Sequence, residues 1–158
     1  MEDDVSVFLG VLISKKEDGS LELIKKGLIG RIIKALGIEN ASSKATPAET
    51  TALPADPDGP HTDGDFNYRS VIGILGYLTG NIQPELAFAH HQCARYSHAP
   101  RMIHEVALKR IGRYLLHTKE KMLVMKPTGD IKLECYVDAD FAGLWGSEDP
   151  NSPNSVKG

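Results

Sequence analysis

The first forty residues combine an apolar run with an amphipathic segment. Residues 5–13 are apolar and rich in β-branched side chains, which predicts a largely buried strand. A turn at residues 17–20 can return the chain as a hairpin through residues 21–24. Apolar residues within 28–36 then recur at helical spacing, and Gly37 is a suitable C-terminal cap. The pattern predicts a strand or hairpin followed by one helix.

Residues 40–64 contain Pro, Ala, Ser, Thr, Asp and Gly with almost no large apolar side chain. A segment of this composition cannot bury a core, because it lacks the apolar surface that would offset the entropy lost on ordering. We therefore expect a long loop or linker that divides the chain.

Three helices are expected after this loop. The first carries an apolar stripe within residues 71–78. The second begins near Pro84, whose missing N–H is tolerated in a first turn, and the third spans about residues 102–117. The period then changes to that of strands at residues 122–125 and 131–137, which flank a turn.

The composition is that of a globular protein, with 41% hydrophobic and 25% charged residues and a net charge of −3. The charge is uneven. Residues 95–126 hold eight Lys or Arg against two acids, and from residue 128 onward six acids face two lysines. This distribution suggests an anion-binding surface beside an element that carries carboxylates. A solvated helix face followed by a polar tail explains the same pattern and stays open as the alternative.

The basic residues of the third helix form the best candidate for a binding site. Lys109, Arg113 and His117 lie four residues apart, with Arg110 alongside, and apolar residues occupy a neighbouring face. One face can thus pack on the domain while the other contacts phosphates, which Arg and Lys bind without reading base sequence. Ordinary amphipathicity with solvated cations is the alternative.

Carboxylates and histidines offer two further candidate sites. Asp138 and Asp140 end an apolar strand, where a carboxylate can hold Mg²⁺ through oxygen ligands, although an Asp here can equally begin a turn. His90, His91 and Cys93 lack the paired spacing of zinc ligands, so packed or phosphate-facing histidines are expected. The two cysteines are expected to be reduced, packed thiols.

Several other classes of site and location find no support in the sequence. No phosphate-binding loop, nucleophile elbow, His-Glu-x-x-His or Tyr-x-Asp-Asp sequence occurs. No apolar run is long enough to cross a bilayer, and the acidic residues 1–4 are unlike a secretory signal. We therefore expect an intracellular protein, cytoplasmic or nuclear.

Five stretches of the chain together resemble the copia-type retrotransposon polyprotein. They are FLGV at 8–11, YRSVIGILGYL at 68–78, NIQPELAFA at 81–89, HEVALKRIGRYL at 104–115 and YVDADFAG at 136–143. In order, they are similar to the strand after the catalytic hairpin of the polymerase, to three helical motifs and to the opening of ribonuclease H. Gln83 stands where the family usually has Arg, and Glu85 where it usually has Asp.

The resemblance implies an α+β fold and a division of the chain. The fold would comprise an N-terminal strand or hairpin with a helix, a long loop, a three-helix segment, and the first strands of a truncated ribonuclease H-like mixed sheet. The parts would be the end of the palm and start of the thumb (1–38), a loop or linker (39–66), a helical thumb or connection segment (67–118) and the start of ribonuclease H (119–158).

The resemblance also implies functional residues. Asp138 matches the first metal-binding carboxylate of the nuclease, whose cofactor in the family is Mg²⁺. Lys109, Arg110 and Arg113 would contact the backbone of an RNA–DNA hybrid or a DNA duplex weakly and without sequence preference. One carboxylate cannot organise two metal ions, so we expect neither catalysis nor stably bound Mg²⁺ unless missing polyprotein segments join the chain. A small helical protein-interaction module with no nucleic-acid role is the alternative.

Overall fold

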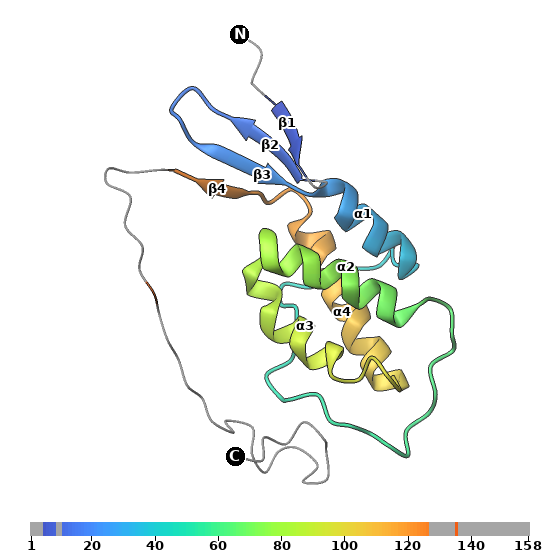
Figure 1. The fold of residues 1–158 in the computed structure, drawn as a ribbon. Helices are drawn as coiled ribbons and strands as arrows, with labels where there is room; N and C mark the ends of the chain where they lie inside the picture. The colour runs from blue at the N-terminus through green and yellow to red at the C-terminus, as the bar shows by residue number, and fades with distance from the viewer. Residues whose placement is uncertain (1–4, 9–10, 127–134, 136–158) are drawn as a thin grey trace.

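A computed structural model describes residues 5–8, 11–126 and 135 (Figure 1). Within these ranges the fold is mixed α+β, with four α-helices, a short 3-10 helix and one four-stranded antiparallel sheet. Figure 1 shows the sheet at one end of the molecule and the helices gathered beside it. The predicted α+β class is confirmed. No described helix is both long enough and apolar enough to span a membrane.

The sheet begins as a three-stranded meander of β1 (Val5–Phe8), β2 (Val11–Lys15) and β3 (Leu21–Ile24). Strand β1 pairs antiparallel with β2, and Phe8 lies opposite Val11. The prediction of one strand over residues 5–13 is therefore wrong. Apart from Ser6 and Gly10 the run is apolar, so Gly10 alone could have marked the reversal of direction.

The hairpin between β2 and β3 confirms the predicted turn at residues 17–20. Gly19 adopts a left-handed φ of 80°, which suits glycine. The carboxylate of Asp18 accepts hydrogen bonds from the Ser20 hydroxyl at 2.6 Å and the Ser20 backbone N–H at 3.0 Å. The hydroxyl of Ser20, the Lys126 ammonium 2.9 Å away and the Ser20 amide together hold the pKa of Asp18 well below its usual range.

The fourth strand, β4 (Leu123–Met125), comes from the far end of the described chain and pairs antiparallel with β3. The sequence predicts a strand here, and its existence is confirmed. The strand extends the N-terminal sheet, and the prediction that it is one of the first strands of a ribonuclease H-like mixed sheet is not confirmed. Apart from Cys135, the strand predicted at residues 131–137 lies outside the described residues.

The structure has four α-helices within the described residues: α1 (Lys26–Ala35), α2 (Tyr68–Asn81), α3 (Ala87–Ala94) and α4 (Met102–Thr118). The 3-10 helix η1 (Pro84–Leu86) leads into α3, so the second predicted helix is divided at its first turn. The side chain of Asn67 caps α2 by accepting a hydrogen bond from the Ser70 N–H at 2.9 Å. After α1, Gly37 takes a φ of 63°, which confirms the predicted cap.

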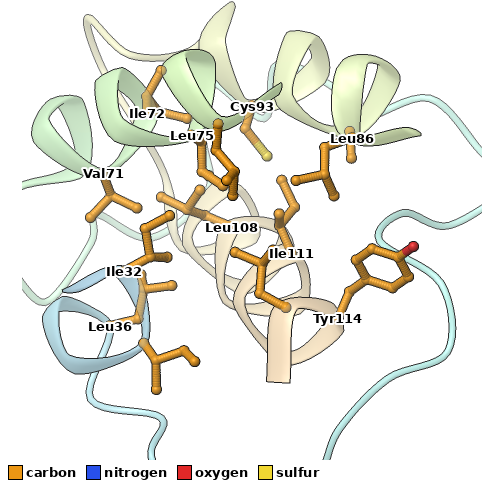
Figure 2. Packing of buried hydrophobic residues seen from close by; sticks show 14 of the residues in the cluster. Ile32, Leu36, Val71, Ile72, Leu75, Leu86, Cys93, Leu108, Ile111 and Tyr114 are labelled. Atoms are coloured by element: carbon orange, nitrogen blue, oxygen red, sulfur yellow. The ribbon is translucent and has the colours of Figure 1, made fainter. Parts of the chain in front are cut away.

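The hydrophobic core lies between the inner faces of the four helices (Figure 2). Helices α2 and α3 cover α4 on one side, and α1 closes the core near α2. Ten of the cluster residues are labelled in Figure 2: Ile32, Leu36, Val71, Ile72, Leu75, Leu86, Cys93, Leu108, Ile111 and Tyr114. The apolar stripes predicted from helical spacing therefore face a common interior.

Residues 39–66, called the strap below, contain no helix and no strand beyond an isolated bridge at His61. That part of the loop prediction is confirmed. As predicted, this segment forms no core of its own. Its apolar side chains Ala41, Ala48, Leu53 and Phe66 instead pack partly buried against the helical cluster, which the sequence did not indicate.

Hydrogen bonds tie the strap to α3 and α4. The amide side chain of Gln92 accepts from the Leu53 N–H at 3.0 Å, and the Tyr96 hydroxyl donates to the Leu53 carbonyl at 2.8 Å. Farther along, the Met102 N–H donates to the Pro60 carbonyl at 3.0 Å. Three backbone groups of the strap are thus paired with the side chains of Gln92 and Tyr96 and with the start of α4.

Candidate nucleic-acid interface on helix α4

His104, at the third position of α4, takes part in capping the start of the helix and binds the strap. The ring Nδ1 of His104 accepts the backbone N–H of Arg101 at 2.8 Å, and Nε2 lies 2.9 Å from the carbonyl oxygen of Pro54. A carbonyl cannot donate, so Nε2 carries the proton and the ring is neutral. The side chain is fully buried and stacks on Tyr96 with ring centroids 4.1 Å apart.

Burial is the main cause that lowers the pKa of His104, since an imidazolium would lose its hydration inside the protein. A protonated ring could not accept the Arg101 N–H, so the cap requires the neutral form. No distinct role was predicted for His104 from the sequence. Its place at the third position of a helix is the signal that could have found it, because a side chain there can reach back to the capping residue.

Lys109 is the first of the three cations predicted to contact nucleic acid. Its ammonium lies 2.6 Å from the carboxylate of Glu105, one turn earlier on α4, and 5.7 Å from the ring centroid of Phe66. Glu105 is only 2% exposed. The ion pair keeps this buried carboxylate compensated, which is a structural use of the lysine charge.

Arg110, the second cation, binds the strap through both terminal nitrogens of its guanidinium group. Nη1 donates to the carboxylate of Glu49, and Nη2 donates to the hydroxyl of Thr46 at 2.7 Å. Its Nε is buried and has no hydrogen-bond partner among the described residues. The carboxylate of Glu49 therefore compensates most of the positive charge on Arg110.

Arg113, the third cation, also contacts the strap but meets no acid. Its Nε donates to the carbonyl of Ser42 at 2.5 Å and its Nη2 donates to the Ser42 hydroxyl. The backbone carbonyl of Arg113 accepts the Lys44 N–H at 3.1 Å. Across the described ranges, no carboxylate lies within ion-pair distance of its guanidinium. The structure thus brings all three predicted residues onto one side of α4 but gives only Arg113 an uncompensated charge.

The histidines and cysteine of α3 do not converge on a metal. The Nε2 of His90 lies 3.1 Å from the Ile72 carbonyl, and His91 is exposed. Cys93 is a buried free thiol, and burial raises its pKa to about 11, so it is a packing residue rather than a ligand or nucleophile. The free thiol confirms the prediction for this cysteine. Cys135 is also free but exposed, so the prediction of a packed side chain is wrong there.

One cluster of carboxylates does form among the described residues. Oxygens of Asp63, Asp65 and Glu105 lie within 4.8 Å of one another. Two of these side chains are exposed and the third is paired with Lys109, so the cluster is explained by the ion pair and by solvation. Asp138, the predicted magnesium ligand, and the neighbouring Asp140 lie outside the described residues.

The amino-acid sequence of the chain is similar to those of several known proteins. It is 30% identical over 141 residues to the "Retrovirus-related Pol polyprotein from transposon RE2" of Arabidopsis thaliana, covering 89% of this chain and 10% of that protein. It is 24% identical over 140 residues to the "Putative transposon Ty5-1 protein YCL074W" of Saccharomyces cerevisiae, covering 46% of that protein. The chain is homologous to part of the Pol polyprotein of retrotransposons. The predicted resemblance to the copia-type polyprotein is thereby confirmed.

The match to Pol polyproteins runs through nearly the whole chain but corresponds to about a tenth of the RE2 protein. A shorter stretch of 76 residues is 38% identical to the "Secreted RxLR effector protein 161" of Plasmopara viticola, and this match covers 48% of this chain and 54% of that protein. No family model and no solved structure matches the chain. The Pol relationship thus rests on sequence, and the structure adds the contacts of the individual residues.

Proposed function

We propose that this segment of a retrotransposon polyprotein serves as the thumb and connection of a reverse transcriptase, with α4 against the backbone of a nucleic-acid duplex. The five motifs and their order support this place in the polyprotein. The observation that carries the contact is Arg113, whose guanidinium is oriented by Ser42 and faces no carboxylate among the described residues. An oriented arginine is well suited to a phosphate, since its planar fork matches two oxygens.

The other two cations have a supporting part in this proposal. Lys109 and Arg110 are each paired with a glutamate, so they add little net positive charge at the surface. We expect them to hold the strap and Glu105 in place, and to contact phosphate only where the strap moves. The partner is an RNA–DNA hybrid or a DNA duplex, bound without sequence preference.

The 158-residue chain alone is proposed to be catalytically inactive. Asp138 is the one residue that the resemblance aligns with a nuclease metal ligand, and two-metal cleavage needs several convergent carboxylates. The described carboxylate cluster does not fit Mg²⁺, because Glu105 is already compensated by Lys109. Incubation with Mg²⁺ and a labelled hybrid should therefore give neither cleavage of the RNA strand nor primer extension.

A binding titration tests the nucleic-acid contact. Fluorescence anisotropy with a short RNA–DNA hybrid should show affinity that falls steeply between about 50 and 200 mM salt. Arg113→Gln should weaken binding and reduce the salt slope by about one. The same change at Arg31, exposed on α1, is the matched control and should have little effect. Affinity that ignores salt, or no affinity at low salt, would remove the proposal.

One observation favours the alternative of a helical protein-interaction module. Phe88 on α3 and Val106 on α4 are large apolar side chains that are 51% and 60% exposed. A module of this kind would capture a protein partner through these residues. Its affinity would then survive charge reversal at Lys109, Arg110 and Arg113, and it would not bind duplexes.

A further inference from the structure

A cavity of about 590 Å³ lies between the strap, α3 and α4. This volume is within the usual range for sites that bind small molecules. Its walls are mainly apolar and come from three separate parts of the chain. Leu53 lines it from the strap, Phe88 from α3, and Ile103 and Ile111 from α4.

Two buried donors among the lining residues lack acceptors. Gln92 is 4% exposed, and its Oε1 is occupied by the Leu53 N–H at 3.0 Å. This bond fixes the orientation of the amide, so its Nε2 group is left with no hydrogen-bond partner among the described residues. The Nε of Arg110 is likewise buried and unpartnered. A buried donor without an acceptor destabilises the folded protein, so an acceptor brought by a ligand would be favoured here.

The charges around the cavity select the kind of acceptor. Four cationic side chains line it: Lys44, Lys109, Arg110 and Arg113. Lys109 is paired with Glu105 and Arg110 with Glu49, so the excess positive charge comes from Lys44 and Arg113. A positive rim above an apolar interior favours an anionic group on an apolar body.

We propose that this cavity binds an amphipathic carboxylic acid. The apolar chain would lie against Leu53, Phe88 and Ile103, and the carboxylate would accept hydrogen bonds from Gln92 and be attracted by the cationic rim. Such a ligand would join the strap to α3 and α4 and so stabilise all three. This inference does not depend on the proposed contact with nucleic acid.

Sodium decanoate, used below its micelle-forming concentration, is the probe, and 1-decanol is the uncharged comparison. Binding is followed by NMR at the side-chain amide of Gln92 and the backbone amide of Leu53, and by calorimetry. Decanoate should shift both signals and bind at least about tenfold more tightly than decanol, because only the anion meets the charged donors. Equal affinity for decanol, or shifts confined to residues outside the cavity, would overturn the proposal.

Two variants sharpen the test. Gln92→Glu keeps the oxygen that accepts the Leu53 N–H but replaces the free donors with an acceptor, so decanoate affinity should fall by about tenfold or more. Gln83→Glu is the matched control, because Gln83 is also 4% exposed and does not line the cavity. Phe88→Ala removes a half-exposed wall without touching the core and should weaken both probes. Unchanged decanoate binding by Gln92→Glu or by Phe88→Ala contradicts the assignment.

Discussion

The helical bundle and the sheet bury their apolar side chains to different extents. In the bundle, Leu75, Leu78 and Leu108 are fully buried between helices that lie far apart in sequence. Among the described side chains of the strands, Val11 is the one buried apolar residue, whereas Val124 is 54% exposed. The bundle is therefore stabilised mainly by close packing and the sheet mainly by backbone pairing.

The ion pairs of the sheet do not make up this difference. Lys16 pairs with Glu22, and Lys126 with Asp18, at the surface. Exposed pairs of this kind contribute little in water, because solvent screens the charges. The bundle with its strap should therefore keep its structure under conditions that loosen the sheet.

The largest expected effect is the difference in stability loss between a substitution in the bundle and one in the sheet. Leu108→Ala leaves a cavity in the bundle and should lower the free energy of unfolding by about 2–5 kcal/mol. Val124→Ala removes a mostly exposed side chain from β4 and should change it by less than about 0.5 kcal/mol. Urea denaturation followed by circular dichroism measures both. Similar losses in the two variants would show that the regions are packed alike.

The next largest loss of stability is expected where α4 contacts the end of α1. A Cβ atom at Gly112 would lie 2.5 Å from Cδ1 of Ile38 and 2.6 Å from Cδ1 of Leu36. Gly112→Val should therefore destabilise the protein by about 1–3 kcal/mol through overpacking. Gly73→Val is the control in α2, where a Cβ meets nothing within 4 Å, and its effect should stay within about 0.5 kcal/mol. A stable Gly112→Val variant would contradict this packing.

His104 tests whether the strap belongs to the bundle. His104→Gln can still accept the Arg101 N–H, but it loses the contact with Pro54 and the stack on Tyr96. We expect a loss of about 1–3 kcal/mol in the free energy of unfolding, because a buried hydrogen-bonded group is removed. Thermal denaturation at neutral pH measures it, and no loss would mean that the strap is held without this residue.

The same residue gives stability a dependence on pH. Burial places the pKa of His104 below the ordinary value of 6.5, so the unfolded chain binds this proton more readily than the folded one. Its contribution is complete above about pH 6.5 and declines as the pH falls below that value. Denaturation curves from pH 7.5 to 5 (about the range of histidine titration) should show a decline that is weaker in His104→Gln. An equal decline in both proteins would assign it to other groups.

The smallest change in stability is expected for a substitution at the junction between sheet and bundle. Lys25 is 3% exposed, its ammonium lies 3.7 Å from the ring centroid of Tyr77, and it has no hydrogen-bond acceptor among the described residues. Burial lowers its pKa, which shows that the charged form is disfavoured there. Lys25→Met should leave stability unchanged or raise it by up to about 1 kcal/mol, as urea denaturation can check. A clear loss would mean that the cation–π contact outweighs desolvation.

Local spacing was sufficient to predict the helices, and not the contacts between distant segments. The apolar stripes of α1, α2 and α4 follow from helical periodicity, and Gly37 from its place after a stripe. The pairing of β4 with β3 joins residues about a hundred positions apart, which no local pattern encodes. The reversal between β1 and β2 was missed because an apolar run looks the same in one strand or two.

The three cations of the candidate site were predicted from the sequence, but the residues that bind them were not. The sequence placed Lys109, Arg110 and Arg113 on one side of a helix. It could not show that Glu49, 61 residues from Arg110, and Ser42, 71 residues from Arg113, bind them. A polar segment held by side-chain hydrogen bonds has no hydrophobic period, so its role as a strap becomes visible only in three dimensions.

The strap is an integral part of the helical bundle, and native-state hydrogen exchange at the backbone amides of Leu53 and Lys44 measures this, because these amides donate to Gln92 and Arg113 respectively. We expect both amides to exchange as slowly as amides within α4, and to exchange faster in His104→Gln. Exchange of both amides at the rate of an unstructured peptide would show that the strap is not part of the bundle.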